Sequence, residues 1–116
     1  MEVLNIIGPN DTFTSTKNKL TSLGLVIKEY PDLDLYLVKY DKKKSDMTNE
    51  DVKKCRGIIA KISDNKLLCY PPAKSCNLED IYTSIEQWKG LSIEDFIDGT
   101  MINMFFHTNR WIISTR

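Results

Sequence analysis

The apolar residues of this chain come in short runs, and each run stops at residues that favour turns. Residues 33–40 begin with a leucine at every second position, which is the pattern of a half-buried β-strand. Two later pairs of runs flank the turn-forming dipeptides Asp64-Asn65 and Thr108-Asn109, so each pair predicts a β-hairpin. These pairs are residues 56–63 with 66–70, and residues 100–106 with 110–114. The chain is therefore constrained mainly to antiparallel strand pairing.

Capping residues and helical spacing predict helices between these strands. Asp11 or Thr12 can cap a helix over residues 13–23, which Gly24 would end. Residues 78–88 place apolar side chains on one helical face, so we expect that helix to pack on the hairpins. The other predicted elements are strands over residues 2–7 and 25–30, a turn at Pro31-Asp32 and a short helical turn after Thr48 or Asn49. We expect an α+β fold of antiparallel β-hairpins with one or two packed helices.

Composition excludes several classes of protein. The chain has 116 residues, with 16 Lys and Arg against 16 Asp and Glu, and 41% of its residues are apolar. This balance predicts one globular domain and disfavours a protein that coats nucleic acid by charge alone. No apolar run reaches the roughly 18 residues of a membrane span, and the first residues do not form a secretory signal. We expect the three cysteines to be reduced thiols in the cytoplasm, and one histidine is too few for a zinc cluster.

Four local motifs contain residues that suit chemistry, although each has a plain structural explanation. An Arg-Gly pair at a strand start is often only a turn, and a lysine after two prolines is usually a solvated loop residue. An Asp-Gly pair can be a hairpin turn, and a tryptophan beside two isoleucines usually lies in a core. The four motifs are Cys55-Arg56-Gly57-Ile58-Ile59, Pro71-Pro72-Ala73-Lys74-Ser75, Asp98-Gly99-Thr100-Met101-Ile102 and Trp111-Ile112-Ile113-Ser114-Thr115-Arg116.

The order of these motifs resembles the N-terminal part of the nucleotidyltransferase domain of ATP-dependent RNA ligases. That superfamily includes DNA ligases and mRNA capping enzymes, and the likeness extends to phage tRNA-repair ligases and ligase-like proteins of large DNA viruses. The matching elements run over residues 39–116, while residues 1–38 carry no matching motif. We therefore expect a ligase-like subdomain over residues 39–116, preceded by an α/β segment of unmatched role, in one compact domain overall.

The resemblance also implies a nucleotide site that would use ATP and magnesium. In such ligases a lysine amine attacks the α-phosphorus of ATP, and cationic side chains stabilise the developing charge. By resemblance, Arg56 and Lys74 are those cations and converge on one concave site. Asp98 and Gly99 would lie at the pocket, and Arg116 would match the basic residue that follows the hairpin.

One residue departs from the family pattern. The nucleophilic lysine of the family stands two positions before Asp-Gly, and Phe96 occupies that position here. Phenylalanine cannot form a phosphoramidate, so we assign no catalytic residue. The family's metal-binding glutamate motif would lie beyond Arg116, so we also assign no metal ligand.

Three interpretations remain open. The first is a ligase-like fold without adenylylation activity, which binds a nucleotide or nucleic acid or has a structural role in a virion. The second is a genuine RNA ligase with elements outside this chain, and the third is a small α+β module that binds proteins in a larger assembly. A viral protein of this kind would reside in the host cytoplasm or the virion, and none of the three requires a membrane.

Aromatic residues give further expectations. We expect Trp88 and Trp111 to fill the core, and at most one of Phe105 and Phe106 to be buried, because neighbouring strand residues point to opposite faces. A face that carries Lys28 and Lys39 beside Tyr30, Tyr36 and Tyr40 would suit base stacking and phosphate contacts. The interpretation we favour for these residues is amphipathic strands with extended lysine side chains.

Overall fold

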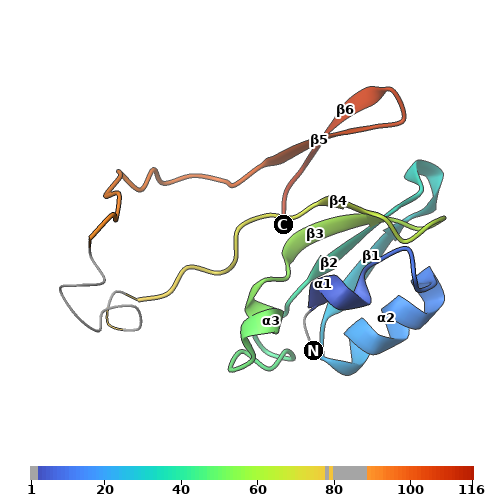
Figure 1. Cartoon of the computed structure of the whole chain (residues 1–116), viewed down its shortest axis with the longest axis horizontal. Coiled ribbons are helices and arrows are strands. Elements are labelled where there is room, and N and C mark those ends of the chain that lie inside the picture. The colour runs from blue at the N-terminus through green and yellow to red at the C-terminus, as the bar shows by residue number, and fades with distance from the viewer. Residues whose placement is uncertain (1–2, 78, 80–88) are drawn as a thin grey trace.

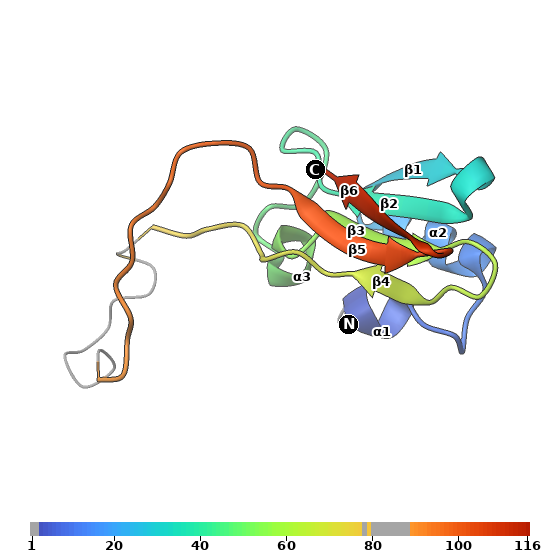
Figure 2. The same cartoon turned by 90° about the horizontal axis from the view of Figure 1, so that it is seen from above.

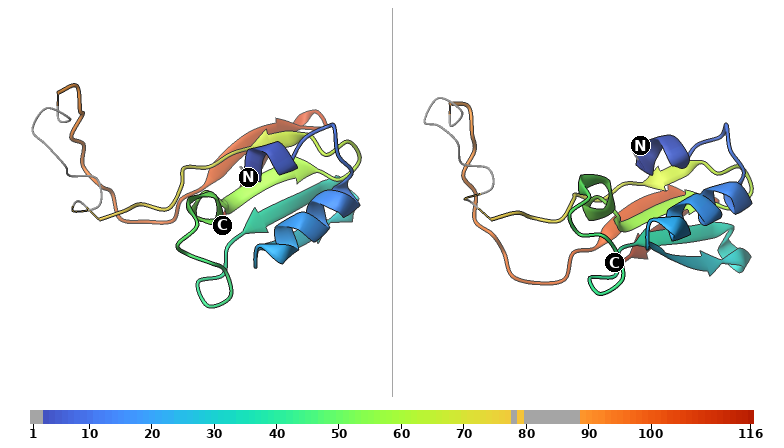
Figure 3. Two further views of the ribbon diagram at one scale, coloured as in Figure 1. Left: turned by 60° about the horizontal axis from the view of Figure 1, so that its bottom comes forward. Right: turned by 90° about the horizontal axis from the view of Figure 1, so that it is seen from below.

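The computed structural model describes residues 3–77, 79 and 89–116, and it shows an α+β architecture. Its strands are β1 (Val26–Tyr30), β2 (Leu35–Lys39), β3 (Arg56–Lys61), β4 (Leu67–Cys69), β5 (Asn103–His107) and β6 (Arg110–Ser114). Its helices are α1 (Val3–Ile6), α2 (Phe13–Ser22), the 3-10 turn η1 (Pro31–Leu33) and α3 (Glu50–Lys53). Strands β1 to β4 form an antiparallel sheet in the order β1-β2-β3-β4. Helices α1 and α2 lie on one face of this sheet, and the β5–β6 hairpin lies on the other (Figure 1, Figure 2 and Figure 3).

The first element is a helix, so the strand predicted over residues 2–7 is wrong. Val3, Ile6 and Ile7 are all buried, and their spacing of three and four positions places them on one helical face. Helix α1 packs against α2, where the carbonyl oxygen of Ile6 accepts a hydrogen bond of 3.1 Å from the hydroxyl of Thr16. A short apolar run does not distinguish a helix from a strand by its pattern, and here the contact with α2 decides.

Helix α2 is capped as the sequence predicts. The Thr12 hydroxyl accepts a hydrogen bond from the backbone N–H of Ser15, at 3.2 Å. After the helix, Gly24 adopts a φ of +75°, which side chains disfavour. A Cβ atom at this position would lie 2.8 Å from the carbonyl oxygen of Lys44. The loop after β2 can therefore approach this closely only because Gly24 has no side chain.

The central sheet is buried on both of its faces. Tyr36 and Val38 of β2 belong to the core beneath the helices, whereas Leu35 and Leu37 belong to a second core beneath the hairpin. We expected a boundary between an α/β segment over residues 1–38 and a ligase-like subdomain over residues 39–116. This boundary falls inside β2, which pairs with both β1 and β3. The two expected segments therefore contribute to one sheet.

The β5–β6 hairpin is confirmed, and its turn has the geometry that a two-residue hairpin requires. Thr108 and Asn109 have φ values of +47° and +60°, as in a type I′ turn. His107 is buried, and its ring Nε2 lies 2.9 Å from the carbonyl oxygen of Leu33. This hydrogen bond helps to fix the hairpin over the end of η1. The β3–β4 hairpin across Asn65 is confirmed as well.

The hairpin has one covered face and one exposed face. Phe105 is buried in the second core, while Phe106 is exposed, as the alternation of strand residues predicts. Trp111 pairs with Phe106 across the hairpin and is 63% exposed, so the expectation that it fills the core is wrong. The reason is register: Trp111 stands on the face of β6 that points away from the sheet.

The segments between β4 and β5 lead away from the sheet and back again (Figure 1 and Figure 2). In the described part of this connection, Ile93 and Phe96 are about nine-tenths exposed, at 91% and 92%. The helix predicted over residues 78–88, including Trp88, lies outside the described residues. In the described part of the chain, no helix is both long enough and apolar enough to span a membrane.

Candidate functional site

A groove of about 290 Å³ lies between the central sheet and the hairpin. Leu35 and Leu37 of β2 contribute apolar side chains to it, and Ile112 contributes another from β6. The aromatic ring of Tyr30 stands at the end of β1, where it is 44% exposed. The groove is therefore apolar within and open to solvent at its edge.

The charged residues of the groove are all positive. Lys28 of β1 and Arg116 after β6 line it, and no Asp or Glu side chain does so among the described residues. The hydroxyl oxygen of Ser114 is buried beside them and has no hydrogen-bond partner in the described part of the chain. The arrangement suits a ligand with a flat apolar part and an anionic part.

The position of Arg116 is set by two contacts. Its guanidinium carbon lies 4.0 Å from the centre of the Tyr40 ring, a cation–π contact. Its backbone passes Gly57, where a Cβ atom would lie 3.4 Å from the Cα of Arg116. Gly57 also has a φ of +100°, which favours glycine. The Arg-Gly motif at the start of β3 therefore meets the motif that ends after β6.

Arg56 and Lys74 lie in one neighbourhood, and neither lines the groove. The Arg56 Nη1 donates a hydrogen bond of 3.1 Å to the carbonyl oxygen of Ala73, and its buried Nε has no partner among the described residues. The backbone N–H of Lys74 donates to the carbonyl oxygen of Lys53 at 3.0 Å. The Lys74 amine, however, points to the carbonyl oxygen of Ser75, at 3.3 Å, and does not line the groove.

The Asp-Gly motif is not part of the groove either. Asp98 and Gly99 are exposed, and a Cβ atom at Gly99 would have nothing within 4 Å. Of the five residues that the resemblance assigns to a nucleotide site, the structure brings only Arg116 to the groove, with Arg56 beside Gly57 at its end. The other three, Lys74, Asp98 and Gly99, lie between β4 and β5 in the chain.

The structure adds residues that the sequence interpretation set aside. Lys28 and Tyr30 alternate along β1, and the register places both over β2 on the hairpin side. The sequence feature that could have indicated this site is the occurrence of Lys28 and Lys39 beside Tyr30, Tyr36 and Tyr40. We interpreted it as ordinary strand amphipathicity. Ser114 belongs to the motif around Trp111, but nothing in the sequence distinguishes its hydroxyl from a solvated one.

The two less exposed cysteines, Cys55 and Cys69, do not supply an activated nucleophile. Burial, with a smaller effect from the nearby Asp51 carboxylate, raises the pKa of the Cys55 thiol to about 12. Burial also raises the pKa of the Cys69 thiol. Both thiols are therefore protonated at neutral pH and are weak nucleophiles. In the described residues, His, Cys, Asp and Glu side chains do not gather in a group of three that would hold a metal ion.

Comparison with known proteins does not add to this evidence. No protein-family model, no curated protein and no solved structure matches the chain. The resemblance to RNA ligases thus depends on the order of the four motifs alone. What the groove binds must be argued from its own side chains.

Proposed function

We propose that this chain is an RNA-ligase-like domain that binds a nucleotide in the groove and does not form a covalent enzyme–AMP intermediate. The observation that carries the proposal is the groove lining, where Lys28 and Arg116 stand beside apolar walls and no Asp or Glu residue of the described chain takes part. An anionic ligand is favoured at such a site, because both cationic side chains attract it.

The dimensions of the groove favour a small ligand. Its volume of about 290 Å³ is close to the lower end of the range for small-molecule sites, which is about 300 Å³. A base would lie against Leu35, Leu37 and the ring of Tyr30, since apolar and aromatic surfaces suit its flat faces. Phosphate oxygens would reach Lys28 and Arg116.

The ligase-like part of the proposal is supported by the meeting of two motifs. Gly57 and Arg116 are in contact, although one belongs to the Arg-Gly motif and the other ends the last motif. Among the described residues, His, Cys, Asp and Glu side chains do not gather in a group of three that would hold a metal ion by itself. Any magnesium would arrive on the phosphates of the nucleotide, because this ion is commonly held by phosphates with few protein ligands.

Isothermal titration calorimetry with ATP and with AMP tests the proposal on the full chain. We expect binding that weakens with salt, and about a tenfold loss of affinity in each of Lys28→Ala and Arg116→Ala, since hydrogen bonds to charged groups contribute about 1.5–3 kcal/mol. Lys42→Ala is the matched control, because it removes the same charge from a residue that does not line the groove. Absence of ATP and AMP binding to the folded chain, or equal losses in Lys42→Ala, would refute it.

A further inference from the structure

The β5–β6 hairpin presents a second apolar surface, on the side that points away from the central sheet, and Ile113 is the residue that it shares with the groove lining. Cross-strand pairing places Met104 beside Ile113 and Phe106 beside Trp111 on this side, and the rings of the second pair are 5.5 Å apart at their centroids. These four residues are the outer hairpin face. Their side chains are between 55% and 63% exposed, and Ile102 continues the alternation at 57%.

The outer hairpin face departs from the ordinary pattern of a surface strand. A hairpin that covers a core on one side normally carries polar residues on the other, whereas strands buried on both sides read as continuous apolar runs. Here both sides are apolar: Phe105 and Ile112 point to the sheet, and Phe106 and Trp111 point away from it. A contiguous apolar patch of several hundred Å² on a soluble protein marks an interaction site.

From this surface we infer that two copies of the chain associate through their outer hairpin faces. None of the residues of the outer hairpin face is charged. Packing of an apolar partner or a second copy against this face would therefore bury no charge and bring no like charges together. The formal net charge of the whole chain is zero, which removes the general repulsion that keeps copies apart. A two-fold axis through the outer hairpin face would bring the same patch of each copy together, as an isologous interface requires.

The exposed area is sufficient for such a pair. Aromatic side chains carry about 150–250 Å². On the same scale, each of the five residues, at 55–63% exposure, leaves on the order of 100 Å² in contact with solvent. A two-fold pair would bury about 1,000 Å² in total, which reaches the lower limit for a specific interface. Because the buried area is so small, we expect a weak dimer that forms at micromolar to millimolar concentrations.

Sedimentation velocity of the full chain over a wide concentration range tests the inference. We expect a monomer–dimer equilibrium, and at least a tenfold weaker dimer in Trp111→Lys and in Met104→Lys. Neither residue lines the groove, so nucleotide binding should persist in both variants and the two proposals fail separately. Circular dichroism checks that each variant folds. If Trp111→Lys does not fold, Met104→Lys still tests the inference.

Ile93→Lys is the control, because it places the same charge at an apolar residue that is 91% exposed outside the outer hairpin face. We expect its dimer to equal that of the unaltered chain. A chain that stays monomeric at the highest concentration, or a dimer that survives in both hairpin variants, overturns the inference. Loss of the dimer in Ile93→Lys would also overturn it, since the connection between β4 and β5 would then be the contact.

Discussion

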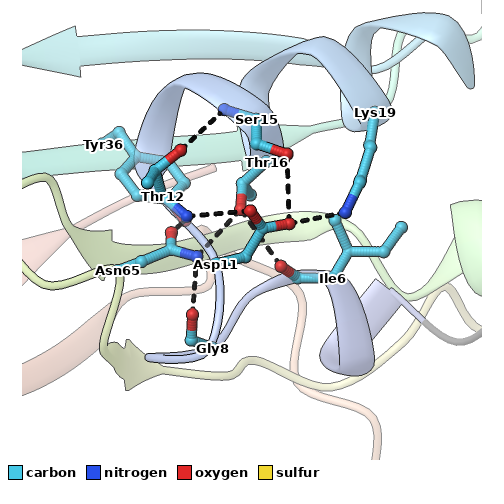
Figure 4. Close-up of polar contacts among 9 residues, drawn as sticks. All are labelled: Ile6, Gly8, Asp11, Thr12, Ser15, Thr16, Lys19, Tyr36 and Asn65. Carbon is cyan, nitrogen blue, oxygen red and sulfur yellow. Dashed lines mark hydrogen bonds and ion pairs between the residues drawn. The ribbon is translucent and has the colours of Figure 1, made fainter.

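The Tyr36 hydroxyl donates a hydrogen bond of 2.5 Å to the side-chain oxygen of Asn65, which lies 29 positions later in the chain (Figure 4). The amide nitrogen of Asn65 in turn donates to the carbonyl oxygen of Gly8 at 2.9 Å and to the Thr16 hydroxyl at 2.8 Å. Burial raises the pKa of the Tyr36 phenol, so the hydroxyl keeps its proton and remains a donor. One asparagine at the β3–β4 turn thus ties together the sheet, α2 and the loop after α1.

Replacement of Asn65 should be among the most destabilising polar substitutions in the chain. Asn65→Ala leaves the Tyr36 and Thr16 hydroxyls and the Gly8 carbonyl without this partner in a buried site, and we expect a loss of about 2–4 kcal/mol of unfolding free energy. Urea denaturation measures it. Asn18→Ala, at an exposed position of α2, is the control and should change the stability by less than about 0.5 kcal/mol. Equal losses in the two variants would show that the buried network contributes nothing.

Gly24 should tolerate no side chain. Gly24→Ala combines a φ of +75° with a contact of 2.8 Å between the new Cβ and the Lys44 carbonyl oxygen, so we expect a loss of about 1–3 kcal/mol. Thermal unfolding by circular dichroism measures the change. Gly8→Ala has open space around the new atom and serves as the comparison. If Gly24→Ala proved as stable as Gly8→Ala, the close approach of the loop after β2 would be wrong.

The three thiols should react in the order of their exposure. Cys76 is exposed, Cys69 is half-buried and Cys55 is buried with its pKa raised to about 12. Because the thiolate is the reactive form, iodoacetamide at neutral pH should label Cys76 first and Cys55 only after unfolding. Timed labelling followed by peptide mass spectrometry gives the order. Early modification of Cys55 in the folded chain would contradict its placement in the core.

The chain should form no covalent nucleotide adduct with ATP and magnesium. Adenylylation needs an amine about 3–3.5 Å from the α-phosphorus, and Phe96 supplies none at the position where the family has its lysine. Intact-protein mass spectrometry after incubation decides the question. An added AMP mass on any lysine would favour the genuine-ligase interpretation, and Lys28, Lys74 and Lys89 are the first residues to examine. Nucleotide binding in calorimetry without an adduct is the expected combination.

The sequence by itself determined the elements that depend on local chemistry. It limited the cap of α2 to Asp11 or Thr12 and that of α3 to Thr48 or Asn49, of which Thr12 and Asn49 form the caps. It also placed the turn of the last hairpin at Thr108-Asn109, because the needed backbone conformation lies within two residues. The alternation of Phe105 and Phe106 was predictable for the same reason, since it follows from the two-residue period of a strand.

Only the tertiary structure decided which faces are covered and which side chains meet. Residues 2–7 have a pattern that suits either a helix or a strand, and packing against α2 selects the helix. Trp111 is exposed because no described element covers the outer side of the hairpin. Lys28 and Arg116 come to one groove because Lys28 lies on the face of the sheet that the β5–β6 hairpin covers and Arg116 directly follows β6. Such long-range placement cannot be predicted from the local sequence.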